Sequence, residues 1–219
     1  MSLNPCRLCG NWAQSFADYG ARHYQRCEIC NLIQLNQDEC PDALAEKAEY
    51  ELHTNHPGDL GYRKFLNKVT TPVLHWLNGR EVNETKLLDF GAGPGPTISV
   101  ILGEAGWSMT NYDPFFCPDQ AALQHQYDLI TATEVVEHFH QPGASWSHMR
   151  GLLAEKGQLV IMTQCFDDYE TPEKFQKWGY IREESHVAFY HTQTMGWIAE
   201  HYELRLSILA PSVFWFARV

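Results

Sequence analysis

Four of the seven cysteines form two pairs with the spacing of a metal site. Cys6 and Cys9 make one C-x2-C pair, and Cys27 and Cys30 make a second pair after 17 intervening residues. Two such pairs can place four thiolates around one zinc ion, in a closed tetrahedron that is structural rather than catalytic. Four free, buried cysteines are the alternative. The spacing favours zinc, which would stabilise a segment too small to fold around a core of its own.

Two carboxylates and an imidazole lie close together further along the chain. Glu134, Glu137 and His138 occupy positions i, i+3 and i+4, which share one face of a helical turn. Such a group suits Mg²⁺ or Mn²⁺, and the imidazole alone suits a general base. His186, in a later segment, is a fourth candidate. Three alternatives stay open: Glu134 contacts a cofactor or substrate, Glu137 and His138 cap a helix, or His138 acts without a metal.

A glycine-rich turn between a strand and a helix predicts a nucleotide site. Residues 87–90 are a short apolar run, typical of a buried parallel strand, and Gly-Ala-Gly-Pro-Gly follows at 91–95. Glycines let the backbone turn sharply and let a ligand approach closely. A second strand, over about 108–112, ends at Asp113, where an acid can bind ribose hydroxyls. The alternative for Asp113 is a turn residue before Pro114.

With these residues in place, the chain resembles the class I S-adenosylmethionine-dependent methyltransferases. Asp89 and the glycine turn match the first motif of that family, and Asp113 matches its second-strand acid. Residues 127–134 match its fourth strand, and residues 157–163 match its fifth. The resemblance extends over residues 81–219. A nicotinamide-binding Rossmann domain is the rival, but an acid inside the first strand is typical of the methyltransferases.

The resemblance implies a set of cofactor contacts. Gly91, Gly93 and Gly95 would surround the methionine part of S-adenosylmethionine. Asp113 would hold the ribose, with Pro114 or Phe115 beside the adenine. The full set implied for the cofactor is Asp89, Phe90, Gly91, Ala92, Gly93, Gly95, Asp113, Pro114, Phe115 and Glu134.

The Glu-x-x-Glu-His string is similar to that of metal-assisted O-methyltransferases, which include quinone-biosynthesis enzymes and small-RNA 2′-O-methyltransferases. This similarity implies that Glu137, His138 and His186 form the catalytic group. It also implies that these residues, together with Glu134, hold Mg²⁺ or Mn²⁺. In the RNA enzymes a later histidine in a His-x-x-Phe setting completes the metal site, and His186 matches that setting in part.

The elements expected around these residues form an α/β fold with a Rossmann-like methyltransferase sheet. Residues 114–127, only 14 positions, separate Asp113 from Asp128, and a helix plus a complete third strand does not fit there. We therefore expect the third strand to be short or absent. Residues 204–209 and 213–218 are strand-like runs joined by Ala-Pro-Ser, which predicts an antiparallel C-terminal hairpin that closes the sheet.

The sequence predicts three domains. They are a zinc ribbon at 1–40, a helical connector or lid at 41–80, and a methyltransferase domain at 81–219. A polar cluster in the connector either covers the ligand site or lies on the surface around a turn; it consists of His53, His56, Tyr62 and Arg63. Residues 164–180 are rich in aromatic side chains, which either line a substrate pocket or form a satellite core.

Composition disfavours several classes of partner. The 219 residues carry 16 Lys and Arg against 27 Asp and Glu, a net charge of −11, whereas nucleic-acid binding needs basic surfaces. No apolar run approaches the ~20 residues of a membrane helix, and the N-terminus has no hydrophobic signal core. We therefore expect a cytoplasmic protein with reduced thiols and no membrane partner. The sequence carries no signal for an oligomeric state.

These observations combine into one functional interpretation. The chain is expected to be an S-adenosylmethionine-dependent methyltransferase with a structural zinc ion, acting on a small-molecule acceptor. O-methylation is favoured over N- or C-methylation. An RNA methyltransferase is one alternative. A non-catalytic module that binds the cofactor, or that uses zinc for an interaction, is another.

Overall fold

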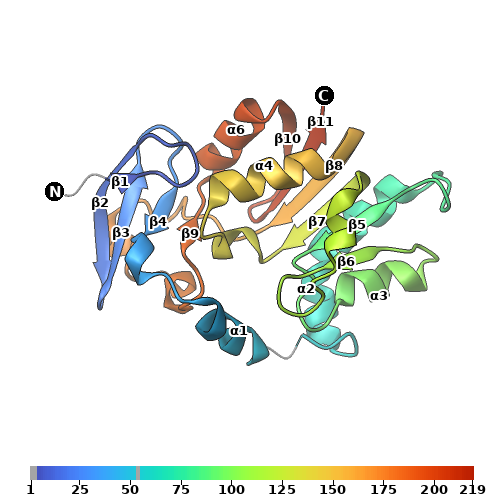
Figure 1. Ribbon diagram of the computed structural model, residues 1–219, viewed down its shortest axis with the longest axis horizontal. Helices are drawn as coiled ribbons and strands as arrows, with labels where there is room; N and C mark the ends of the chain where they lie inside the picture. The colour runs from blue at the N-terminus through green and yellow to red at the C-terminus, as the bar shows by residue number, and fades with distance from the viewer. Residues whose placement is uncertain (1–3, 53–54) are drawn as a thin grey trace.

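Two β-sheets organise the part of the chain that the computed structural model describes, residues 4–52 and 55–219 (Figure 1). His53 of the predicted lid cluster lies outside these residues. The central sheet has six strands, in the order β10 (Leu204–Ala210), β11 (Val213–Arg218), β8 (Leu153–Met162), β7 (Tyr127–Thr133), β5 (Leu87–Phe90) and β6 (Thr110–Tyr112).

The central sheet is mixed. Strands β6, β5, β7 and β8 are parallel, whereas β11 runs antiparallel to both β8 and β10. All four residues of β5 are buried, as expected for a parallel strand covered on both faces. The predicted antiparallel hairpin at the C-terminus is confirmed.

The predicted loss of the third strand is also confirmed. The stretch between β6 and β7 is described throughout, and its regular element is the short 3-10 helix η2 (Gln120–Gln124). The chain has too few residues there for a crossover helix and another strand. As a result β6 forms one edge of the central sheet.

Helices cover both faces of the central sheet. On one face, α2 (Leu60–Leu77) and α3 (Thr97–Glu104) bury Leu66, Val73 and Leu102 against the strands. On the other face, α4 (Pro142–Leu152) and α6 (Thr192–His201) bury Trp146 and Ile198. This is the three-layer arrangement in which ligands bind at the carboxyl ends of the parallel strands.

The N-terminal sheet includes a strand from the far end of the sequence. Its order is β1 (Asn4–Pro5), β2 (Trp12–Tyr19), β3 (Arg22–Cys27), β4 (Ile33–Leu35) and β9 (Ala188–Phe189), and every pair is antiparallel. Figure 1 shows this sheet beside the central sheet, with β9 next to β4. The predicted domain boundaries stay a prediction, but this sheet joins residues from both sides of position 40.

The aromatic segment after β8 packs against the N-terminal sheet. It contains α5 (Pro172–Phe175) and η4 (Gly179–Arg182). Phe166, Phe175 and Trp178 share one buried cluster with Tyr24 and Ile33. The satellite-core interpretation is therefore confirmed for these three aromatic side chains.

The connector between the sheets is helical. After η1 (Gln37–Glu39), α1 (Ala43–Glu51) begins at Asp42, whose side chain accepts hydrogen bonds from two backbone N–H groups of the first turn. Asp59 caps α2 in the same way. The 3-10 helix η3 (Val136–His138) follows β7. None of the described helices combines the length and hydropathy that a membrane crossing requires.

Candidate active site

The turn after β5 has backbone angles and packing that require glycine. Gly91 has a φ of 80° and Gly93 a φ of 63°, in the left-handed region that side chains disfavour. A Cβ atom at Gly91 would lie 2.5 Å from a methyl carbon of Val135, and one at Gly95 would lie 1.8 Å from the carbonyl oxygen of Asn55. The glycines therefore let the connector and the segment after β7 approach the end of β5.

Asp113, at the end of β6, binds this turn directly. Its Oδ2 accepts a hydrogen bond from the backbone N–H of Gly93 at 3.0 Å. Its Oδ1 accepts from the N–H groups of Phe115 at 2.8 Å and Phe116 at 3.0 Å. The turn role, which the sequence left open as the alternative, is thus seen in the structure. A carboxylate has further acceptor sites, so the ribose role stays a compatible prediction.

Asp89 lies behind the turn. It is 4% exposed, and its Oδ1 accepts a hydrogen bond from the Thr131 hydroxyl at 2.7 Å. Burial raises the pKa of Asp89 to about 6, and the Thr131 hydrogen bond opposes this shift. The side chain therefore joins β5 to β7 beneath the site.

A cavity of about 650 Å³ connects the glycine turn with the segment after β7. Most of the predicted cofactor contacts line it: Phe90, Gly91, Ala92, Gly93, Asp113, Pro114, Phe115 and Glu134. Asp89 and Gly95 are not among the lining residues. Within the described chain, the lining contains four acidic residues, Glu46, Asp113, Glu134 and Glu183, and no Lys or Arg. The cavity is therefore acidic and has aromatic walls.

Helix α1 forms one wall of the cavity through Glu46 and Tyr50. The Tyr50 hydroxyl donates to Glu46 Oε1 at 2.5 Å. The Tyr50 ring meets the His138 ring edge-on, with centroids 5.0 Å apart, and contacts the Phe115 ring at 5.8 Å. Burial raises the pKa of the Tyr50 hydroxyl well above its ordinary value. The connector thus touches both the glycine-turn end and the histidine end of the cavity.

The polar cluster predicted in the connector divides between cavity and surface. Tyr62 lines the cavity. His56 accepts a hydrogen bond from the backbone N–H of Gly58, and Arg63 forms an ion pair with Glu104. Neither His56 nor Arg63 is among the lining residues.

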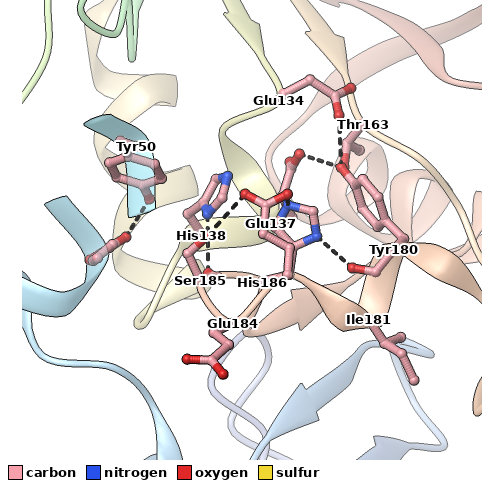
Figure 2. Close-up of polar contacts among 12 residues, drawn as sticks. Tyr50, Glu134, Glu137, His138, Thr163, Tyr180, Ile181, Glu184, Ser185 and His186 are labelled. Carbon is pink, nitrogen blue, oxygen red and sulfur yellow. Dashed lines mark hydrogen bonds and ion pairs between the residues drawn. The ribbon is translucent and has the colours of Figure 1, made fainter. Parts of the chain in front are cut away.

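The hydroxyl of Tyr180 lies between the carboxylates of Glu134 and Glu137 (Figure 2). It donates to Glu137 Oε1, and Glu134 Oε2 lies 3.1 Å from the same hydroxyl. Glu137 is fully buried, and its Oε2 has no hydrogen-bond partner among the described residues. Burial raises the pKa of Glu134 to about 7. Burial, with Glu134 nearby, raises the pKa of Glu137 well above its ordinary value.

Two histidines face each other beside these carboxylates (Figure 2). His138 Nδ1 lies 3.1 Å from the carbonyl oxygen of Ser185, and His186 Nδ1 lies 2.7 Å from that of Tyr180. Because a carbonyl oxygen only accepts, both Nδ1 atoms carry the hydrogen, and acid–base chemistry at either ring would therefore use Nε2. His186 Nε2 lies 3.4 Å from Glu183 Oε2.

The structure brings Glu137, His138 and His186 together as the sequence predicted. One ligand atom from each lies within 4.8 Å of the other two. Glu134 joins this group through Tyr180 rather than directly. Its donors are one carboxylate and two imidazoles, and Glu137 Oε2 is buried without a hydrogen-bond partner in the described chain.

Sequence reasoning did not identify Glu46, Tyr50, Tyr180 and Glu183 as site residues. Glu183 precedes His186 by three positions, which is the same spacing as between Glu134 and Glu137. This spacing is the sequence pattern that could have identified Glu183 as a site residue. Tyr180 belongs to the aromatic segment and differs from its neighbours in having its hydroxyl directed to the carboxylates. No local pattern separated Tyr50 from the rest of α1.

The four predicted zinc ligands form a compact cluster. All four sulfurs lie within 4.8 Å of one another, and all four thiols are free. Cys6 Sγ lies 3.5 Å from Cys30 Sγ, and Cys9 Sγ lies 3.4 Å from Cys27 Sγ. A tetrahedral zinc–thiolate site with bonds of about 2.3 Å has sulfurs about 3.8 Å apart. The geometry of the cluster is compatible with such a site.

Comparison with known proteins gives the family. A model of the methyltransferase domain matches residues 21–207, and a search of curated proteins found no match. An O-methyltransferase family protein from Burkholderia thailandensis has a similar structure, with a TM-score of 0.52 and 13% identity. The alignment covers 82% of this chain and 64% of that protein, so this chain spans less than two thirds of its length.

Two further structures have the same fold. One is a magnesium protoporphyrin IX methyltransferase from Synechocystis with bound S-adenosylmethionine, at a TM-score of 0.54 and 14% identity, covering 82% of this chain and all of that one. The other is a 1,6-didemethyltoxoflavin-N1-methyltransferase from Burkholderia thailandensis, with a TM-score of 0.51 and 13% identity. That alignment covers 94% of this chain and all of the other. The mixed sheet, the glycine turn and the match over most of the sequence agree: this chain belongs to the methyltransferase-domain family.

Proposed function

We propose that this methyltransferase transfers the methyl group of S-adenosylmethionine to a hydroxyl group of a small-molecule acceptor. One observation carries the proposal: a single cavity is lined by the glycine turn and Asp113 at one end and by His138 and His186 at the other. The two fully covered structural neighbours, crystallised with S-adenosylmethionine or S-adenosylhomocysteine, support the choice of cofactor.

The cofactor end of the cavity suits an adenosyl group. The backbone of Gly91 and Gly93 would face the methionine part, and Asp113 would accept hydrogen bonds from the ribose hydroxyls. Phe115 would pack against the adenine. Because the third strand is absent, the adenine contact that this strand usually supplies would come from the loop after β6.

S-adenosylmethionine supplies an electrophilic methyl group, and the protein must align an acceptor with it. His138 is the proposed base, because its Nδ1 is bound to the Ser185 carbonyl and its ring lines the cavity. His138 Nε2 would take the proton of the acceptor hydroxyl as that oxygen is methylated. His186 would orient the acceptor together with Glu183.

The lining of the cavity favours a small molecule over RNA. Four acidic side chains of the described chain line it, with no Lys or Arg, so a phosphodiester would meet repulsion there. The net charge of −11 disfavours RNA on the outer surface as well. Small acceptors such as porphyrins and toxoflavin precursors occur among the structural neighbours.

Two metal sites belong to this proposal. The four-cysteine cluster would hold a structural zinc ion, for which its sulfur separations are suitable. As a second candidate for the reaction itself, Glu137, His138 and His186, with Glu134 near, would hold Mg²⁺ or Mn²⁺. Such an ion would lower the pKa of an acceptor hydroxyl. The buried, unpartnered Glu137 Oε2 favours this candidate.

Calorimetry with S-adenosylmethionine, followed by turnover with a panel of phenols, catechols and N-heterocycles, tests the function. We expect one bound cofactor per chain and release of S-adenosylhomocysteine with a hydroxyl acceptor. Activity that persists in a chelator for Mg²⁺ and Mn²⁺ would remove the metal candidate. Cofactor binding with no turnover of any acceptor would favour a non-catalytic module, and RNA binding that falls steeply with salt would favour RNA.

A further inference from the structure

The segments that carry the acid–base side chains are fastened to the N-terminal sheet. Strand β9 begins two residues after His186 and pairs with β4, with Phe189 opposite Ile33. The N–H of Leu35 donates to the carbonyl of Val187 at 3.0 Å, and the N–H of Val187 donates to the carbonyl of Glu137 at 2.9 Å. Val187 therefore links β4 to the 3-10 helix that carries His138.

Arg22, the first residue of β3, holds the segment that carries Glu183 and His186. Its Nη1 donates to the carbonyl oxygens of Ile181 at 2.9 Å and Glu183 at 3.2 Å. Its Nη2 donates to those of Glu184 at 3.3 Å and His186 at 2.6 Å. One guanidinium group thus binds four carbonyl oxygens, one within η4 and three in the residues that follow it. The planar fork of arginine offers its donors in fixed directions.

These four hydrogen bonds fix the backbone of residues 181–186 and so orient the groups of this segment that face His138. Figure 2 shows the His186 ring and the backbone carbonyl of Ser185 directed toward His138, with Ile181 and Glu184 directed away from the cluster. The bond from His186 Nδ1 to the Tyr180 carbonyl depends on the same short segment. Without the guanidinium, its four acceptors lose a charged donor, which destabilises this local conformation.

Arg7, beside the first cysteine of the cluster, makes a similar connection. Its Nη1 donates to the carbonyl of His140 at 2.9 Å, and its Nη2 donates to those of Leu35 at 2.8 Å and Val187 at 3.1 Å. It therefore ties the loop after η3 and the segment before β9 to one point of the N-terminal sheet.

We propose that Arg22 is a positioning residue for methyl transfer, because it sets where Glu183 and His186 stand relative to His138. The inference rests on the proposed function of that histidine pair. It makes the N-terminal sheet a part of the active site rather than an appended module. Arg7 serves the same purpose for the segment that follows His138.

Arg26 provides a matched control. It lies on the same strand and also reaches across to the methyltransferase part, where its Nη1 donates to the carbonyl of Glu170 at 2.9 Å. It contacts Asn31 and the Phe166 ring as well. None of these partners lines the cavity.

The test compares the full-length, zinc-loaded protein with its Arg22→Ala, Arg22→Lys and Arg26→Ala variants. Nuclear magnetic resonance would record the ring-nitrogen shifts of His186, and calorimetry would record binding of S-adenosylhomocysteine. We expect the His186 shifts of Arg22→Ala to move toward those of free histidine and to return when guanidinium ion is added. Arg26→Ala should keep wild-type shifts, and all variants should keep the wild-type Kd for S-adenosylhomocysteine.

Arg22→Lys keeps the charge but replaces the planar fork by one ammonium group, so a smaller displacement in the same direction is expected. If Arg22→Ala does not fold, the His186 shifts of Arg22→Lys are compared with those of the wild type instead. Wild-type His186 shifts in a folded Arg22 variant, or equal displacement in Arg26→Ala, would overturn the proposal. The His186 measurement needs no substrate. Failure of the wild-type protein to bind S-adenosylhomocysteine would instead contradict the proposed function.

Discussion

At the scale of single residues, Asp113 has two tasks. Its carboxylate accepts three backbone hydrogen bonds that shape the glycine turn and the turn after β6. In the proposed function it also holds the ribose. Both tasks need the two carboxylate oxygens at this position, and both fail when the side chain is truncated.

We therefore expect Asp113→Ala to weaken binding of S-adenosylhomocysteine by about 10- to 100-fold, the equivalent of about 1.5–3 kcal/mol for hydrogen bonds to a charged group. Calorimetry measures this directly. Asp119→Ala is the control, because Asp119 also accepts a backbone hydrogen bond in a turn but does not line the cavity. Equal affinity in Asp113→Ala and the wild type would remove the ribose role.

Asp89 gives a prediction about pH. Its pKa is about 6 in the folded protein against an ordinary value of 3.8, so the folded state keeps the proton to higher pH than the unfolded chain does. The stabilising contribution is complete below the ordinary pKa and is lost as pH rises to the folded pKa. Between about pH 4 and about pH 7, the wild type should lose about 2 kcal/mol more unfolding free energy than Asp89→Asn.

Urea unfolding of both proteins at several pH values measures this difference. Asn keeps an oxygen that can accept the hydrogen bond from Thr131. The comparison therefore isolates the effect of protonating Asp89 on the free energy of unfolding. Parallel pH profiles for the two proteins would show that Asp89 is ionised normally.

The residue scale also shows what sequence could predict. Gly91 and Asp113 were identifiable because their roles depend on a local strand–turn–helix pattern. Glu137, His138 and His186 were predicted as a group, and the structure brings them together. Their immediate partners were not predicted, because their side chains meet only when distant segments pack.

At the scale of elements, α1 is the wall that completes the cavity. No residue of α1 is buried, so the helix has few contacts to hold it other than those made by Glu46 and Tyr50. Tyr50 packs on both His138 and Phe115. The packing contacts of the helix therefore lie mainly at the cavity.

Tyr50→Ala should weaken binding of S-adenosylhomocysteine by about 10-fold, because an aromatic contact of about 0.5–1.5 kcal/mol and some buried area are lost. Leu44→Ala, on the same helix, removes an apolar side chain that is 81% exposed and should bind like the wild type. Calorimetry on both variants distinguishes a cavity wall from a general effect on the helix. Similar affinities for Tyr50→Ala and the wild type would mean that α1 does not hold the cofactor.

The strands differ in how well a local sequence pattern predicts them. The absent third strand followed from a simple count of residues between Asp113 and Asp128. The C-terminal hairpin followed from two apolar runs and the turn between them. Strand β9 has only two residues and exists because it pairs with β4, far away in the sequence, so no local pattern could predict it.

At the scale of the whole molecule, the N-terminal sheet and the central sheet share their cores. Cys6, Cys27 and Cys30 belong to the same buried cluster as Trp146 of α4 and Tyr190. The other face of the N-terminal sheet packs on the aromatic segment after β8. Loss of the proposed zinc ion should consequently affect both parts of the molecule.

We expect zinc removal by a chelator, or Cys27→Ser, to lower the free energy of unfolding by about 4 kcal/mol or more, as losing a structural metal does. Hydrogen exchange should accelerate in residues 181–189 as well as in the N-terminal sheet. Cys117→Ser, outside the cluster, is the control. Acceleration confined to the N-terminal strands would show that the two parts are energetically separate.

The central claim is that the glycine turn and Asp113 hold an adenosyl cofactor whose sulfur points toward His138. A crystal structure of the full-length protein grown with S-adenosylhomocysteine tests it most directly. The account predicts ligand density between residues 91–95 and Asp113, with the ribose hydroxyls on the Asp113 carboxylate and the sulfur facing the histidine pair. An empty cavity, or the ligand bound at another place, would contradict it.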